Sequence, residues 1–372
     1  MTGFAQVFEA YMPYGALALM VTVFATPLAA NLARRAGAMD MPDRELKPHA
    51  RPTPYLGGVA ICLGWAVAAF AAAWIVPAVN TRVVFGIVAG GVAMSVLGLV
   101  DDLRELSPKV RLALSALIIV VVMVVSGVGY DFVRFPLARL DNPLIDALIP
   151  AVSLVLGLVV VLAACNSANL IDGLDGLCAG VTAIISAGFF LLASHLAIHN
   201  AGPEDNEARM ILAIAMLGAT VGFLPFNFNP AKIFMGDAGS MLLGFNCGMM
   251  ILLFAERGLT KWAFGGMMIF ALPLFDTSLA IVRRWRNGRP IFQGDRSHFY
   301  DQLVDRGYSV RRVVAISYVL SAIYALLGLA PIWLRTRYVV AVYAVVVVLT
   351  ILLIIKADMV RVDDPATHRK PI

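Results

Sequence analysis

The 372-residue chain is 60% hydrophobic and carries only 14% charged residues, a composition that excludes an ordinary soluble globular protein. Apolar runs of about 18 or more residues recur along it, each long enough to cross the hydrocarbon core of a bilayer as a helix. The net charge of +5 does not indicate a nucleic-acid partner, because basic loops facing anionic membrane lipid on one side of the membrane account for it.

We predict an all-α, polytopic transmembrane helix bundle that forms a single domain over residues 1–372. Backbone groups in lipid must be satisfied within each spanning segment, which excludes an open sheet as the spanning element. The apolar runs indicate eleven spans, roughly 12–32, 56–77, 83–100, 111–128, 147–164, 177–198, 208–226, 239–255, 262–281, 313–333 and 338–355.

The connections between spans alternate between the two sides of the membrane. One set, together with the C-terminal tail, contains most of the 29 Lys and Arg residues and is therefore predicted to be cytoplasmic, with the N-terminus outside and the C-terminus inside. The polar clusters of the sequence all fall in this set, so we expect them to share one face. Its loops are 33–55, 101–110, 165–176, 227–238 and 282–312.

Two of these clusters come early in the chain. In the first internal loop, Lys47 stands with other basic side chains near a Gly-Gly pair, where a phosphate could reach the backbone; an ordinary positive-inside loop would look the same. Asp101 and Asp102 end the third span, where the helix dipole disfavours negative charge. That placement suggests a divalent-cation site or removal of a proton from an incoming acid, with solvated loop acids as the alternative.

The stretch NSANLIDGLDG, residues 166–176, is the densest polar cluster and lies between two apolar runs. Polar residues at a membrane boundary are costly, which favours a functional site. Helix capping explains one of the two carboxylates Asp172 and Asp175, but not both together with Asn166 and Asn169.

Two later loops complete the set. In FNFNPAKIFMGDAGS, residues 226–240, Asp237 lies between glycines just before an apolar helix, where free backbone amides favour phosphate, and Phe234 offers a flat face to a base or packs in the membrane. The arginine-rich loop 282–312 predicts a short amphipathic helix on the membrane with His298 toward the site; a basic anchor for anionic lipid is the alternative.

Read together, PDRELKPHARPTPYLGG, LGLVDDL, NSANLIDGLDGL, FNFNPAKIFMGDAGS and GDRSHFYDQLVDRG resemble the successive motifs of the polyprenyl-phosphate N-acetylhexosamine-1-phosphate transferase superfamily, in the same order over residues 42–307. Eleven spans with an external N-terminus are similar to the bacterial undecaprenyl-phosphate GlcNAc-1-phosphate branch. The resemblance implies a multi-pass protein of the bacterial inner membrane, with its active site facing the cytoplasm, that starts cell-surface polysaccharide synthesis.

The resemblance also implies the chemistry and the roles of particular residues. Polyprenyl phosphate attacks the β-phosphorus of a UDP-N-acetylhexosamine and releases UMP, and Mg²⁺ (or Mn²⁺) with arginines neutralises the phosphates. Asn169 and Asp237 are implied as metal ligands. Asp101, Asp102, Asp172 and His298 are implied as catalytic residues, and Lys47, Asn166, Asp175, Asn227, Phe234 and Arg296 as substrate-binding residues, with uridine on Asp175, Asn227 and Phe234.

One position departs from the motif pattern. Antigen-type members carry a second histidine two residues after the first, and here Tyr300 stands in its place. GlcNAc is the expected sugar, while a 6-deoxy-N-acetylhexosamine and MurNAc-pentapeptide remain alternatives, as does a homodimer. A secondary transporter is the rival class, since intramembrane carboxylates also mark ion pathways; the location of the acids at one face argues against it.

Overall fold

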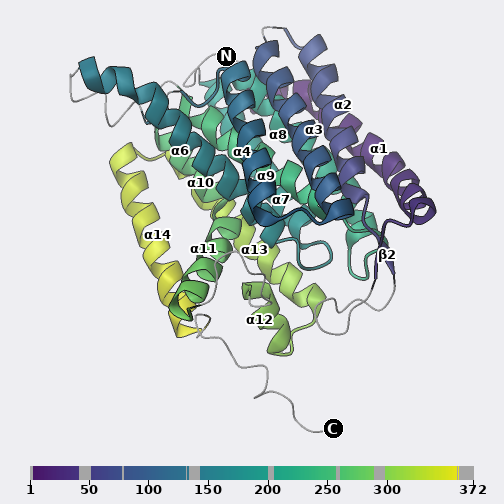
Figure 1. Cartoon of the computed structure of the whole chain (residues 1–372). Helices are drawn as coiled ribbons and strands as arrows, with labels where there is room; N and C mark the ends of the chain where they lie inside the picture. The colour runs from purple at the N-terminus through teal and green to yellow at the C-terminus, as the bar shows by residue number, and fades with distance from the viewer. Residues whose placement is uncertain are drawn as a thin grey trace.

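The computed structural model describes residues 3–41, 52–77, 79–130, 132–133, 143–199, 205–256, 260–288, 298–357 and 359. Almost all of them are helical, and the helices form one membrane-type bundle (Figure 1). They are α1 (Phe4–Ala36), α2 (Gly57–Ile75), α3 (Thr81–Arg104), α4 (Pro108–Ser126), α6 (Pro143–Leu170), α7 (Leu177–Ile198), α8 (Asn206–Asn227), α9 (Gly236–Ala255), α10 (Thr260–Ile269), α11 (Ala271–Arg286), α12 (Phe299–Asp305), α13 (Val310–Gly328) and α14 (Thr336–Lys356).

The predicted all-α transmembrane bundle is confirmed. In the part of the chain that the structure describes, ten helices are long and apolar enough to cross a membrane, and the bent pair α10–α11 makes eleven. A two-stranded antiparallel ribbon, β1 (Met39–Asp40) with β2 (Thr53–Pro54), joins α1 to α2 and was not expected. In Figure 1, α1 begins at one end of the bundle and α14 finishes toward the other, the end at which α12 also lies.

The ninth span is not the single helix predicted over 262–281. The chain bends by 73° between α10 and α11. Pro273 lies in the first turn of α11, and a proline there has no amide hydrogen and its ring excludes the carbonyl four residues earlier, which belongs to Ile269, the last residue of α10. Helix α11 then continues to Arg286, so the loop predicted from residue 282 begins later.

Helix α9 is the centre of the bundle and is buried from Ala238 to Ala255. Its sequence permits this because small residues let neighbouring backbones approach closely. A side chain at Gly58 of α2 would collide with the backbone at Gly239, and one at Gly98 of α3 would collide with the backbone at Asp237. The first turn of α9, which carries Asp237, is therefore held between α2 and α3.

Candidate active site

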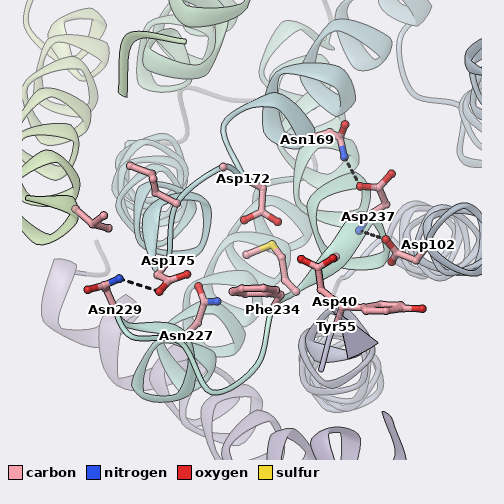
Figure 2. A pocket seen from close by; sticks show the side chains of 15 residues that line it. Asp40, Tyr55, Asp102, Asn169, Asp172, Asp175, Asn227, Asn229, Phe234 and Asp237 are labelled. Carbon is pink, nitrogen blue, oxygen red and sulfur yellow. Dashed lines mark hydrogen bonds between the residues drawn. The ribbon is translucent and has the colours of Figure 1, made fainter. Parts of the chain in front are cut away.

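A cavity of about 520 Å³ opens at the end of the bundle where α3, α6 and α8 finish and α7 and α9 begin (Figure 2). The prediction that the polar clusters share one face is confirmed, because all three main motifs contribute to this cavity. Five carboxylates and no Lys or Arg side chain occur among its described lining residues. The lining comprises Asp40, Tyr55, Asp102, Asn169, Asp172, Gly173, Leu174, Asp175, Asn227, Asn229, Phe234, Met235, Gly236, Asp237 and Val310.

The paired aspartates at the end of α3 have different partners. Asp102 accepts hydrogen bonds from the backbone amides of Asp237 (2.9 Å) and Ala238 (3.2 Å), at the positive end of the α9 dipole. The two backbone amides of the glycine-flanked motif therefore donate their hydrogen bonds to Asp102 and not to a phosphate. Asp101 instead accepts from the Leu106 amide at 2.8 Å, where α3 has ended.

Arg111 of α4 links the two acidic motifs. Its Nη1 lies 2.9 Å from Asp101 Oδ2 and 3.0 Å from Asp237 Oδ2. The other oxygen of Asp237 accepts from Asn169 Nδ2 at 2.7 Å, and the same amide group is 3.1 Å from Ser240 Oγ. Asp237 and Asn169, the predicted metal ligands, are therefore in direct contact at the cavity wall (Figure 2).

Asp175 and Asn227 fix the shape of the opposite wall. Asp175 Oδ2 accepts from Asn229 Nδ2 and from the Ala231 amide, both at 2.9 Å. Asn227 accepts from the Gly176 amide and donates to the Ile233 carbonyl, both at 3.0 Å. These hydrogen bonds link the two site loops to each other. Asp175 bonds to Asn229 and Ala231 of the other loop, and α7 has no side-chain cap.

Asp172 has the most unusual environment of the site. Its carboxylate points into the space between the Asp237 and Asp175 sides of the cavity (Figure 2). No hydrogen bond or ion pair reaches it from the residues that the structure describes. Burial first, and then the neighbouring charges of Asp237, Asp102 and Asp175, raise the pKa of Asp172 well above its ordinary value. Such a carboxylate would be stabilised by a cation.

Phe234 lines the cavity through a rigidly held backbone. Its amide donates to the Pro54 carbonyl at 2.8 Å, and its own carbonyl accepts from the Gly57 amide at 2.9 Å. The motif phenylalanine is thus placed at the site by β2 and the start of α2, and it does not pack in the apolar core.

Asp101, Asn166 and His298, three of the predicted residues, do not line the cavity. Asn166 donates to the Leu162 carbonyl of its own helix and borders a small separate crevice beside Arg111. His298 is buried, with Nδ1 2.7 Å from Asp276 Oδ2, at the start of α12. Lys47 and Arg296 fall outside the described residues.

Tyr300, at the position of the missing second histidine, packs behind the Asp172 loop. Its hydroxyl donates to the Leu170 carbonyl at 2.7 Å, its ring lies parallel to that of His298, and a side chain at Gly173 would overlap it. Burial raises the pKa of Tyr300 well above its ordinary value, so the phenol stays neutral and acts as a donor. The tyrosine therefore supports the loop from behind.

Sequence reasoning missed Asp40, Tyr55 and Asp276. Asp276 accepts from His298 Nδ1 and from the Phe299 amide (3.0 Å), so it tethers α11 to α12. The signal that could have found it is a carboxylate within an apolar span, which is costly without a partner. Asp40 and Tyr55 flank the short ribbon, and their place at the cavity depends on strand pairing that the sequence does not reveal.

No group of three or more His, Cys, Asp and Glu side chains within the described ranges is arranged to hold a metal ion by itself. The donor set still suits Mg²⁺, which is commonly bound through one or two carboxylates, water and substrate phosphates. Asp172 and Asp237, with the Asn169 amide beside them, are the residues that could hold it.

Comparisons with known proteins indicate the family of this chain. The sequence model of glycosyl transferase family 4 matches residues 84–255. The chain is 34% identical over 347 residues to the decaprenyl-phosphate N-acetylglucosaminephosphotransferase of Mycobacterium tuberculosis, covering 88% of this chain and 84% of that protein. It is 32% identical over 330 residues to the probable undecaprenyl-phosphate N-acetylglucosaminyl 1-phosphate transferase of Bacillus subtilis, covering 86% and 85%.

A relative from the other donor branch is similar as well. The phospho-N-acetylmuramoyl-pentapeptide-transferase of Desulforudis audaxviator is 30% identical over 334 residues, covering 84% of this chain and 96% of that protein. Fold, site and likeness together define an integral-membrane transferase. The chain belongs to glycosyl transferase family 4, and its likeness is to the polyprenyl-phosphate N-acetylglucosamine phosphotransferase branch.

Proposed function

We propose that this protein transfers N-acetylhexosamine 1-phosphate, with GlcNAc as the sugar, from the UDP-sugar to undecaprenyl phosphate. A phosphate oxygen of the lipid attacks the β-phosphorus, the bond between the β-phosphorus and the bridging oxygen breaks, and UMP leaves. The product is undecaprenyl-pyrophosphoryl-GlcNAc, which would start a cell-surface polysaccharide. The acceptor is the one named for the Bacillus subtilis relative.

The observation that carries this proposal is the acid-lined cavity at the end of a membrane bundle. A lipid phosphate and a nucleotide diphosphate can meet there only if their negative charges are neutralised, because the described lining offers five carboxylates and no basic side chain. We propose that Asp172, Asp237 and Asn169 would hold Mg²⁺, which would supply that positive charge and stabilise the negative charge on the phosphoryl oxygens. Lys47 and Arg296 would add positive charge at the phosphates.

The residues of the cavity divide the remaining work. Phe234 offers its ring to uracil, and the free Oδ1 of Asp175 is available to a ribose hydroxyl or a uracil N–H, since the known bonds use Oδ2. Asn227 shapes this half through its bonds to both loops. Asp102 borders the reacting end and would orient or deprotonate the lipid phosphate, while Asp101 acts through Arg111 on the position of Asp237.

A single displacement suits this arrangement better than a covalent phospho-enzyme. Asp101, Asp102 and Asp237 already accept hydrogen bonds from protein groups, so none of them is a free nucleophile. Asp172 has no partner among the described residues, but it is the carboxylate that a cation would occupy. The proposal places this end of the bundle on the cytoplasmic side of a bacterial inner membrane, where a UDP-sugar arrives from solution and the acceptor from the bilayer.

Purified protein given UDP-GlcNAc, undecaprenyl phosphate and Mg²⁺ should release UMP. The same assay with UDP-GalNAc, a 6-deoxy-N-acetylhexosamine donor and UDP-MurNAc-pentapeptide defines the sugar. We expect UDP-GlcNAc to be preferred and the pentapeptide donor to be inactive, because a site built on a few hydrogen bonds rejects donors that leave its polar groups unpaired. Turnover of the pentapeptide donor alone would overturn the choice of sugar, and absence of UMP with every donor would overturn the proposed reaction.

A further inference from the structure

Helix α13 holds both cavity loops from behind, and neither family motifs nor the matched region 84–255 includes it. The guanidinium of Arg311 donates twice to the Asn229 carbonyl, from Nε at 3.1 Å and from Nη2 at 2.9 Å. The hydroxyl of Tyr318 donates to the Gly176 carbonyl at 2.6 Å. The two side chains are seven residues apart, which places them on one face of the helix two turns apart.

Asn229 and Gly176, whose carbonyls accept these hydrogen bonds, are each hydrogen-bonded in turn to a residue of the donor half of the cavity, the half proposed to bind the nucleotide. Asn229, held by Arg311, donates through its side chain to Asp175 (Figure 2). Gly176, held by Tyr318, donates through its amide to Asn227. A displacement of either anchor would therefore move Asp175 or Asn227, although neither Arg311 nor Tyr318 is among the residues that line the cavity.

The contact of Tyr318 depends on two glycines. A side chain at Gly180 of α7 would overlap the phenol ring, so the absence of one provides the space that the ring fills. Gly176 has φ of 80°, a conformation that favours glycine and that turns its carbonyl toward α13. The fit is specific to the tyrosine, since phenylalanine would fill the same space without making the bond.

A second cavity of about 350 Å³ lies between the loops and α13. Its lining is mostly apolar and includes Phe228, Val314 and Ala315, with Asp175 and Asn229 shared with the main cavity. Because this space separates part of the loops from the helix, close packing does not support the loops there. The hydrogen bonds from Arg311 and Tyr318 span this space and connect α13 to the loops.

We propose that Arg311 and Tyr318 are positioning residues for the nucleotide half of the donor site, acting through Asn229–Asp175 and Gly176–Asn227. This inference rests on the proposed function for the identity of the donor, but the linkage itself is a property of the protein without substrate. Loss of either side chain should weaken donor binding and leave the acceptor half, on the Asp102 and Asp237 side, intact.

The steady-state test uses Arg311→Gln and Tyr318→Phe. The matched controls lie on the same helix: Arg312→Gln, whose guanidinium stacks on Tyr308 at 4.7 Å, and Tyr324→Phe, whose hydroxyl bonds to Thr350 at 3.0 Å. We expect KM for UDP-GlcNAc to rise on the order of three- to tenfold in the two test variants, in keeping with the loss of one or two hydrogen bonds. KM for undecaprenyl phosphate should stay within about twofold, Arg311→Lys should recover part of the loss, and both controls should behave as wild type.

A second readout needs no turnover. Hydrogen–deuterium exchange of the substrate-free protein should become faster at the Gly176 and Ala231 amides in Arg311→Gln and Tyr318→Phe, and unchanged in the two controls. Unchanged exchange in the test variants, or equal changes in KM for donor and acceptor, would overturn the positioning role. If the wild-type protein turns over no UDP-sugar but the exchange result is as expected, the proposed function fails, while the linkage of Arg311 and Tyr318 to the two loops stands.

Discussion

At the scale of single residues, Asp172 is distinguished by having no hydrogen-bond partner among the described residues while other carboxylates surround it. Asp102, Asp175 and Asp237 also line the cavity, but each accepts hydrogen bonds from protein groups and so holds the structure together. A partly buried carboxylate beside other carboxylates is costly when ionised without a partner, and a cation would relieve that cost. Asp172 is therefore the residue whose behaviour should change most when metal is added.

We expect the thermal stabilisation of the protein by Mg²⁺ to increase with pH, and Asp172→Asn to reduce and flatten this increase. The pKa of Asp172 is raised in the folded state, so the folded protein retains its proton after the unfolded chain has lost it. Without metal, the stability that this proton contributes is present at low pH and is lost as pH rises toward the raised pKa. Mg²⁺ binds the deprotonated carboxylate, so its effect grows over the same range.

Melting temperatures with and without Mg²⁺ across that pH range measure the effect. Asp146→Asn is the matched control, since Asp146 is an exposed carboxylate in the first turn of α6 and far along the helix from Asn169. An Asp172→Asn protein that keeps the full pH-dependent response to Mg²⁺ would show that another group binds the ion.

At the scale of elements, the sequence predicted the spans well because each is a long apolar run. The expected span 56–77 corresponds to Gly57–Ile75, and 239–255 corresponds to α9 apart from its first turn. The break at Pro273 was missed because hydropathy does not respond to a lost amide hydrogen. The partners of Asp102 were also out of reach, since they depend on the packing of α3 against α9, and two separate apolar helices do not indicate which ends meet.

That packing can be tested at Gly98. A methyl group there would collide with the backbone at Asp237 and Ala238, which cannot move without displacing the first turn of α9. We expect Gly98→Ala to lower stability by about 1–3 kcal/mol, the usual cost of overpacking, and to reduce activity strongly. Gly266→Ala is the control, because its nearest neighbour would be Phe254 Cδ2 at 3.3 Å. Thermal melting and UMP release measure both, and a fully active Gly98→Ala protein would refute the close-packing argument.

At the scale of the whole molecule, the sequence predicted that polar motifs far apart in the chain share one end of the bundle, because an even number of predicted spans separates each pair of these loops. The structure confirms that they meet. Which side of the membrane this end faces follows only from the distribution of Lys and Arg.

Cysteine labelling tests that orientation. All four native cysteines are buried, so a membrane-impermeant thiol reagent should find little background. Asp305 and Arg335 are both exposed, the first in α12 near the site and the second just before α14 at the opposite end. In intact cells we expect Arg335→Cys to react and Asp305→Cys to react only after permeabilisation. Reaction of Asp305→Cys from outside would invert the bundle and exclude a cytosolic donor.

The central claim, transfer of a sugar phosphate rather than of a sugar, is tested most directly by following each phosphorus of the donor. Purified protein is given UDP-GlcNAc labelled with ³²P at either the α or the β position, together with undecaprenyl phosphate and Mg²⁺. We predict that the β label moves into the lipid fraction and that the α label is released as UMP in equal amount. Recovery of both labels in UDP while the sugar enters the lipid would contradict the account, as would their recovery in intact donor.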